Sequence, residues 1–328
     1  RQMCIRDRKW VGGIFYEHIH RLIASFVGIL TLLLSIFLWR FEERKWMHKL
    51  GWTALTAVIF QGLLGGLTVL FFLPTAISMT HGILAQSFFC LTIAIAFFLS
   101  DEWAKPSPKN LDLIDKSIVR WILILTGVIY MQLIFGALMR HTGSGLAVLD
   151  FPFSNGEIFT LPNSEFLYNV NEGRFNLGLD SVMMYQIYFH LIHRFWALVV
   201  VAVGMVLTVK ILRYRKNNDY FIIPILFIDL LLLTQIMLAA AVIWSVRAPI
   251  ITTLHVWTGA LLLGSSFLFS LRSVKLFIPS RLYWSLFKKE PISIMKVDGL
   301  KSQVSSFWEL SKPRIIWLVL VATFIGCY

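Results

Sequence analysis

The segment "FYEHIHRLIASFVGILTLLLSIFLWR" (residues 15–40) decides the fold of this chain. Most of it is an apolar run of lipid-spanning length, because a helix needs about 20 apolar residues to cross the hydrocarbon core of a bilayer. It opens, however, with Glu17, His18, His20 and Arg21. Ionisable side chains are costly at membrane depth, so each one is a candidate functional residue. The segment therefore predicts a membrane helix with a functional site at its beginning.

Similar runs recur along the chain. The 328 residues are 57% hydrophobic, with a mean hydropathy of +0.73 and 27 Phe, far more apolar surface than a soluble domain of this size needs. The sequence therefore predicts an all-α polytopic membrane protein. The predicted spans are residues 17–39, 52–72, 77–99, 118–139, 183–212, 221–244 and 250–271, and an eighth apolar run covers 314–328.

The net charge of +12 orients these spans and does not indicate nucleic acid as a partner. Lys and Arg gather in the short loops after the first, third, fifth and seventh spans, which the positive-inside rule places in the cytoplasm. The loop 140–181 carries several acids and is expected outside. We expect a bacterial cytoplasmic (inner) membrane protein, in contact with lipid. The three Cys are too far apart to indicate a metal site or a disulfide framework.

An internal repeat connects the two halves of the chain. "HRLIA" at 20–24 matches "HRFWA" at 193–197, "QGLLGGLTVL" from Gln61 matches "QIMLAAAVIW" from Gln235, and "THGILAQSFF" from Thr80 matches "LHVWTGALLL" from Leu254. All three matches have an offset of 173 or 174 positions. Such a constant offset predicts two structurally related units.

The repeat also predicts the domain organisation. Span 118–139 has no counterpart in the first unit, so we expect an additional helix before residue 1 in the natural protein. That makes two pseudo-symmetric four-helix units, related by an axis along the membrane normal. The predicted limits are 1–105 for the first unit, 106–271 for the second, 272–306 for a polar linker and 307–328 for the truncated start of another domain.

Four histidines obey the repeat and form the candidate site: His20 and His81 in the first unit, His193 and His255 in the second. All four fall near the outer ends of their spans. Two imidazoles on facing helices suit a haem iron with two axial ligands. Zinc or copper would need a further ligand, which the sequence does not supply nearby. A structural role in hydrogen bonding is the alternative for any one of them.

Neighbouring residues allow both a site role and a simpler one. Arg21 and Arg194 each follow a candidate ligand and could pair with haem propionates or anchor the helices at the interface. Gln61 and Gln235 could belong to the site or only hold helices together. Among the other histidines, His190 is the strongest competing ligand, three residues before His193.

Glu17 breaks the symmetry of the repeat. It lies three residues before His20 and therefore on the same helix face, whereas His190 takes its place in the second unit. An acid beside only one haem predicts different tasks for the two units, with Glu17 handling protons at a haem that is acted upon. A solvated acid near a helix N-terminus is the alternative.

These motifs resemble the haem A synthase family over roughly residues 10–271. The family motif E-x-x-H-R appears as Glu17 to Arg21, and its Arg-x-Thr-Gly-Ser-Gly-Leu-Ala run appears within "QLIFGALMRHTGSGLAVLDFP" from Gln132. The spans with a single His after "MT" and "TL" match as well. Where many members carry loop cysteines, this chain has Val148 and Ser154.

The resemblance implies an oxidoreductase. It would oxidise the C8 methyl group of haem O to the formyl group of haem A by successive hydroxylations, for cytochrome oxidase. The second unit would hold a haem b cofactor through His193 and His255. The first would bind the substrate haem O through His20 and His81, with the carboxylate of Glu17 needed for catalysis.

The tail "FWELSKPRIIWLVLVATFIGCY" (307–328) resembles the start of haem O synthase, the protohaem farnesyltransferase. This resemblance implies a fusion to that enzyme or an association with it, although the tail lacks the aspartate-rich motif of a working prenyltransferase. The leading rival function is a di-haem electron-transfer protein of cytochrome b type, and a histidine-relay transporter is a further one. The electron acceptor, the oxygen source and a homo-oligomeric state are left open.

Overall fold

The computed structural model describes residues 13–71, 74–104, 116–154, 156–157, 161–213 and 219–276, and these are helical apart from loops and one isolated bridge between Ser154 and Glu157. The helices are α1 (Gly13–Phe41), α2 (Lys45–Leu70), α3 (Thr75–Phe98), α4 (Asp101–Ala104), α5 (Lys116–His141), η3 (Ser144–Leu146), α6 (Ser164–Asn176), α7 (Met184–Arg213), α8 (Asp219–Trp244) and α9 (Pro249–Lys275). Seven of them are long and apolar enough to cross a membrane. The predicted all-α polytopic membrane fold is confirmed.

Several helices extend beyond the predicted spans. Helix α2 begins at Lys45 instead of residue 52, and α9 continues to Lys275, into the segment predicted as a linker. Hydropathy detects the apolar stretch that lies in lipid, whereas Lys and Arg are good helix formers and continue a helix beyond it. Helices α4 and α6 were not predicted. The proposed helix before residue 1 and the tail 307–328 lie outside the described residues.

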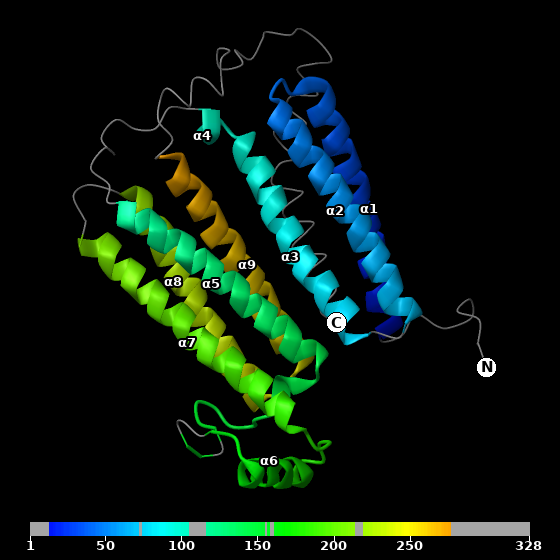
Figure 1. Ribbon diagram of the computed structural model, residues 1–328, viewed down its shortest axis with the longest axis vertical. Coiled ribbons are helices and arrows are strands. Elements are labelled where there is room, and N and C mark those ends of the chain that lie inside the picture. Colours follow the sequence, from blue (N-terminus) through cyan, green and yellow to red (C-terminus); the bar gives the residue numbers. More distant parts are fainter. Residues whose placement is uncertain are drawn as a thin grey trace.

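The long helices form two groups side by side (Figure 1). The first unit consists of α1, α2 and α3, which contact one another in that order. In the second unit α5, α7, α8 and α9 form a closed ring of contacts. Helix α3 joins the units because it contacts both α5 and α9. Below, the end of the bundle that carries α6 is called the α6 end, and the opposite one the α4 end.

The interface between the units is tight because a glycine of α9 faces a bulky aromatic side chain of α3. A Cβ atom at Gly264 would lie only 2.8 Å from Cε1 of Phe89, which is buried. Hydroxyl pairs add polar contacts between helices. Ser87 of α3 and Tyr130 of α5 are 2.6 Å apart at their oxygens across this interface. Within the second unit, the hydroxyl oxygens of Thr126 in α5 and Ser270 in α9 are 2.8 Å apart. Small residues and hydroxyls are typical of helix packing in lipid.

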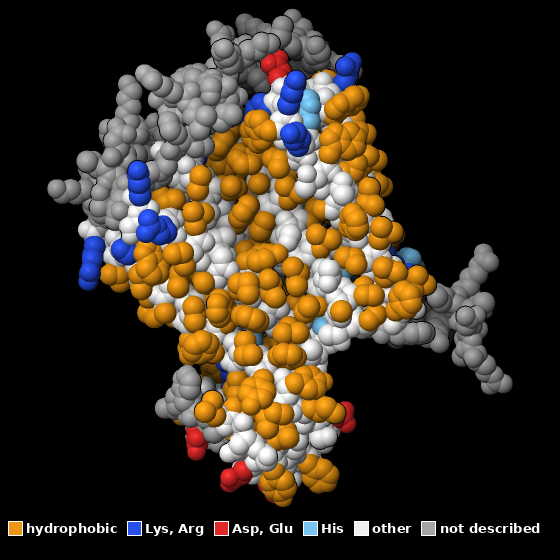
Figure 2. All heavy atoms as spheres, in the orientation of Figure 1, with side chains coloured by type: hydrophobic (Ala, Val, Ile, Leu, Met, Phe, Trp, Pro, Cys, Tyr) orange, Lys and Arg blue, Asp and Glu red, His pale blue; other side chains and the backbone are white. Residues whose placement is uncertain are grey.

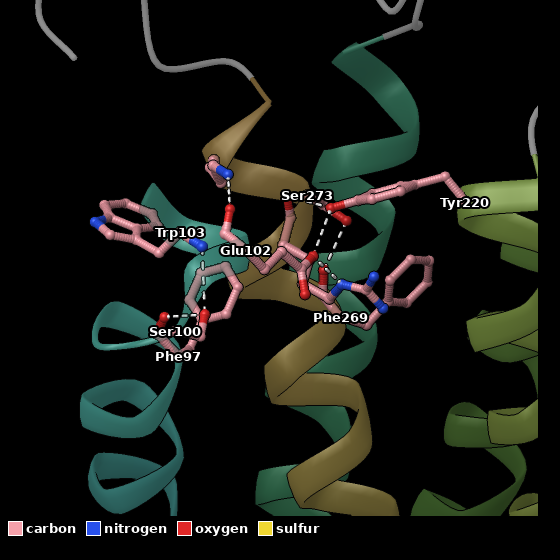
Figure 3. Close-up of polar contacts among 9 residues, drawn as sticks. Phe97, Ser100, Glu102, Trp103, Tyr220, Phe269 and Ser273 are labelled. Atoms are coloured by element: carbon pink, nitrogen blue, oxygen red, sulfur yellow. Dashed lines mark hydrogen bonds and ion pairs between the residues drawn. The ribbon is translucent and has the colours of Figure 1, made fainter. Parts of the chain in front are cut away.

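A polar cluster closes the interface at the α4 end (Figure 3). Arg272 Nε donates to Glu102 Oε1 at 2.6 Å, and the Tyr220 hydroxyl donates to the same oxygen at 3.4 Å. Lys275 donates to the backbone carbonyl of Glu102. The guanidinium of Arg272 also lies over the Tyr220 ring, 4.9 Å from its centroid. The cluster thereby fastens α4, at the end of the first unit, to α8 and α9 of the second.

The α6 end carries a small cap formed by the loop between α5 and α7. Ala147, Val148, Phe166, Val170 and Ile187 belong to its own apolar core. Arg174 is buried there and donates to the carbonyl oxygens of Asp180, at 2.7 Å, and Leu146. In Figure 2 the acidic side chains of the visible face gather mainly on this cap, Lys and Arg gather toward the α4 end, and apolar side chains cover the band between them.

Candidate functional site

The four repeat-related histidines lie at the same end of the bundle. Helices α1, α3, α7 and α9 all start at the α6 end (Figure 1), and each histidine falls within the first ten residues of its helix. All four side chains are half-buried. Because the helices point the same way, the repeat places both histidine pairs at similar depth, as the sequence predicted.

In the second unit the two histidines and two glutamines form one cluster. His193 and His255 lie close enough for their charges to interact. Gln132 Nε2 donates to the backbone carbonyl of His193 at 3.1 Å and lies 3.3 Å from both ring nitrogens. Gln235 Nε2 lies 3.4 Å from Nε2 of His255. Helices α5, α7, α8 and α9 each contribute one of these four residues, so the cluster lies inside the ring that they form.

The first unit repeats part of this arrangement. His20 and His81 are within electrostatic reach of each other, and Gln61 Nε2 donates to the backbone carbonyl of His81 at 3.0 Å. One turn before His20, Glu17 accepts a hydrogen bond from Arg21 Nη2 at 2.5 Å. Both partners of this ion pair are about half exposed, with 49% of the Glu17 side chain and 57% of the Arg21 side chain accessible.

Arg194 and His190 have structural contacts in the second unit. The Nη groups of Arg194 donate to the carbonyl oxygens of Val148, Asp150 and Phe153 at 3.2, 2.7 and 2.9 Å. His190 is 2% exposed, and its Nδ1 lies 3.0 Å from the carbonyl oxygen of Ser144. Arg194 therefore holds the loop between α5 and α7 that forms the cap, below called the cap loop. His190, the competing ligand candidate, packs against η3 instead of facing His255.

Unpaired buried atoms test whether a haem suits these clusters. Ten buried side-chain polar atoms of the described residues have no hydrogen-bond partner. Five of them belong to the histidine–glutamine pairs: Oε1 of Gln61, Gln132 and Gln235, and Nδ1 of His81 and His255. Buried polar groups are normally paired, so such a concentration indicates a ligand or a rearrangement at this place.

The donor set also agrees with haem. Among the described residues, no three His, Cys, Asp or Glu side chains come together as a metal site would require. Haem iron takes its equatorial ligands from the porphyrin and needs at most two side chains. The pairs His20–His81 and His193–His255 offer that number, and their role as ligands stays a prediction.

Sequence reasoning missed the roles of two residues. Gln132 contacts His193, whereas the sequence shows it only as the first residue of a family motif. His141 follows Arg140 at the start of the outer loop, where the sequence predicts no site role, but it lies within electrostatic reach of His81. The carbonyl oxygen of His141 also accepts a hydrogen bond from Thr75, at the start of α3, at 3.2 Å. For Gln132 a signal was present, because Gln132 and Gly136 have the same spacing as Gln61 and Gly65.

Comparison with known proteins identifies the family of this chain. A protein of Halalkalibacterium halodurans named haem A synthase is 35% identical over 146 residues, which cover 43% of this chain and 47% of that protein. One of Shouchella clausii with the same name is 32% identical over 145 residues (43% and 47%), and one of Listeria welshimeri 26% over 216 residues (65% and 65%). The chain spans about half the length of the first two relatives. Residues 6–267 match the cytochrome oxidase assembly protein family (COX15-CtaA), and the chain therefore belongs to that family.

Proposed function

We propose that this protein is a haem A synthase, which oxidises the C8 methyl group of haem O to the formyl group of haem A. One observation carries the proposal. Two repeat-related histidine pairs lie at similar depth, and among the residues that the structure describes only the pair of α1 and α3 has a carboxylate, Glu17, one turn away. The name that the relatives carry supports the same activity.

In the second unit, His193 and His255 would hold a haem b cofactor. When bound, haem b would supply a redox centre that accepts electrons one at a time. The polypeptide contributes the surrounding cage, because α5 and α8 bring Gln132 and Gln235 against the two imidazoles. The Nη groups of Arg194 bind the cap loop, which leaves its buried Nε as the donor for a propionate.

In the first unit, His20 and His81 would bind haem O as the substrate. With water as the oxygen source, conversion of the methyl to a formyl group releases four protons and four electrons (CH3 + H2O → CHO + 4 H+ + 4 e−). A proton acceptor beside the porphyrin is therefore needed, and the electrons would pass to the haem b held by His193 and His255 and from there to an external acceptor. Glu17 suits that role because it lies one turn from His20. An exposed ion pair contributes only about 0–1 kcal/mol, so Arg21 can exchange Glu17 for a haem propionate at little cost. The exchange would free the carboxylate to act as a base.

We infer the following orientation and partners. The α4 end faces the bacterial cytoplasm, supported by the basic loops of the sequence, and both haem sites lie toward the outer face of the inner membrane. The tail 307–328, outside the described residues, starts a domain related to haem O synthase, which would deliver the substrate. Its support is the motif "ELSKPR". The four domain limits, 1–105, 106–271, 272–306 and 307–328, and a homo-oligomeric state are part of the same proposal.

The test is synthesis of haem A in a host that makes haem O only. The full-length gene is expressed there, and the membrane haems are extracted and separated with mass detection. A new peak at the mass of haem A, or of its hydroxylated precursor, is the expected result. Unchanged haem O in a protein that holds bis-histidine haem b would refute the synthase and favour the di-haem electron carrier.

A further inference from the structure

The three glutamines of the candidate site share a local pattern. Each is followed four residues later by a small residue: Gln61 by Gly65, Gln132 by Gly136, and Gln235 by Ala239. Residues four apart lie on the same helix face, so glutamine and small residue form one surface toward the neighbouring helix. On that neighbouring helix lies His81, His193 or His255, respectively. The pattern therefore recurs in both units.

The small residues allow the close approach. A Cβ atom at Gly136 would lie 3.2 Å from Cε1 of His193, and one at Gly65 would lie 3.4 Å from Cε1 of His81. At Gly259, one turn after His255, a Cβ atom would lie 3.3 Å from Nε2 of Gln235. A larger side chain at these positions would push the imidazole or the carboxamide away. The imidazoles of His81 and His193 thus lie against the backbone of a neighbouring helix, and Gln235 lies against the helix that carries His255.

The chemistry of the pair changes when iron binds. A neutral imidazole has one N–H and one lone pair, and iron takes the lone pair, so the other ring nitrogen keeps its hydrogen and needs an acceptor. Metal-bound histidines almost always donate this N–H to a carboxylate, a carbonyl or water. Lipid offers no water as a substitute. In the structure the glutamine Nε2 atoms face the histidines, whereas all three Oε1 atoms remain buried and unpaired, as do Nδ1 of His81 and His255.

A carboxamide can serve both states because it carries a donor and an acceptor on the same carbon. Rotation about its last bond exchanges Nε2 and Oε1 without moving the helix. Gln235 is the clearest case, since its Nε2 lies 3.4 Å from a single ring nitrogen, Nε2 of His255. The amide can therefore donate to the free imidazole and accept from the iron-bound one.

We propose that Gln61, Gln132 and Gln235 are positioning residues that fix the orientation of His81, His193 and His255 and accept the ring N–H of the haem-bound imidazoles. This rests on the proposed function, because it assumes haem at both histidine pairs. Gln132 and Gln235 serve the haem of the second unit, and Gln61 serves the substrate haem of the first. None of the three contacts the reacting carbon.

The test uses the full-length protein purified in detergent with its haem b. The affinity for haem b is measured by its transfer to apomyoglobin, the ligand field by electron paramagnetic resonance, and the midpoint potential by redox titration. Q132L and Q235L should each weaken haem b binding roughly 10- to 100-fold, as loss of a second partner of a metal ligand does. Q235L should raise the midpoint potential. Q235E should retain haem and lower the potential, since a carboxylate accepts the N–H more strongly.

Two matched variants separate orientation from packing. Q86L removes a half-buried glutamine of α3 whose buried Oε1 is also unpaired and which makes no hydrogen bond to a described histidine, and it should leave haem b unchanged. Q61L should leave the haem of the second unit unchanged and weaken binding of added haem to the first. Wild-type affinity and potential in Q132L and Q235L, or equal losses in Q86L, would overturn the inference alone. A wild-type protein without bound haem would overturn the proposed function together with it.

Discussion

Equivalent positions of the two units have different environments at the scale of single residues. Glu17 is half exposed and paired with Arg21, whereas His190, its counterpart in the repeat, is buried against the carbonyl oxygen of Ser144. The same turn of a related helix thus presents a carboxylate in one unit and a packed imidazole in the other. This difference is the residue-level basis for our proposal that the chemistry takes place in the first unit.

Glu17→Gln should therefore abolish haem A formation and leave haem b in place. The amide keeps the size and polarity of the side chain but cannot accept a proton, and general-base catalysis typically contributes about 10²- to 10⁴-fold. The readout is the ratio of haem A to haem O in extracted membranes. The control is Glu165→Gln, which changes an exposed acid at the start of α6 and should leave the ratio of haem A to haem O unchanged. Normal haem A formation in the Glu17 variant would remove this residue from the mechanism.

At the scale of elements, the turn between α1 and α2 is fixed by a compact ion pair. Arg44 donates to Glu42 through Nε at 2.7 Å and Nη2 at 2.8 Å, and its Nη1 reaches the carbonyl oxygen of Phe98 at 3.0 Å. Burial alone would raise the pKa of Glu42. The hydrogen bonds and the charge of Arg44 outweigh burial and hold the pKa below its ordinary value of 4.5.

This shift predicts a loss of stability in acid. Because the folded protein binds the proton more weakly than the unfolded chain, the contribution of Glu42 is complete above its ordinary pKa and disappears as the pH falls through the lower, folded value. Thermal unfolding in detergent between pH 7 and pH 3 measures it. Glu42→Gln should lower the stability by about 1 kcal/mol at pH 7. It should also make the loss of stability between pH 7 and pH 3 (the acid limb of the stability curve) smaller than in the wild type. An unaltered acid limb would contradict the assignment.

The cap loop is the second element held by one arginine. Arg194→Ala would remove the donors for Val148, Asp150 and Phe153, so backbone amides of residues 148–157 should exchange hydrogen faster. Helix α6 should keep its protection, because the separate contacts of Arg174 hold it. Hydrogen exchange followed by mass spectrometry checks both statements. Equal exchange in variant and wild type would show that the apolar core of the cap suffices.

How much could be predicted from sequence depended on the kind of signal. The seven long helices were predictable because lipid demands apolar runs, and the repeat gave the histidine positions through a constant offset. Helix α6 could not be predicted from hydropathy, because its sequence "SEFLYNVNEGRFN" is too polar. The contact of Gln132 with His193 depends on the rotation of α5 against α7, which packing determines. The sequence gives only an indirect signal of this contact, because Gln132 and Gly136 repeat the spacing of Gln61 and Gly65.

At the scale of the whole molecule, stability depends on the fit of α3 against α9. Gly264→Ala should destabilise the protein by about 1–3 kcal/mol, the usual effect of overpacking, because the ring of Phe89 has no free space to move into. Thermal unfolding in detergent is the measurement. Gly28→Ala is the control, since a Cβ atom there meets nothing within 4 Å. It should be neutral or stabilise α1 by up to about 1 kcal/mol. Equal stability of both variants would mean that the interface is loose.

Helix α3 is fastened to the second unit at three levels. Thr75 bonds to the carbonyl of His141 at the α6 end, Ser87 to Tyr130 halfway along, and the Glu102 cluster closes the α4 end. His81 on α3 is therefore held in place relative to His193 and His255 of the second unit. With iron in both pairs, an electron would tunnel across a gap of constant width, and the tunnelling rate falls steeply with distance. Turnover would then depend on the driving force for electron transfer and on proton release, because the distance between the two iron sites would stay constant.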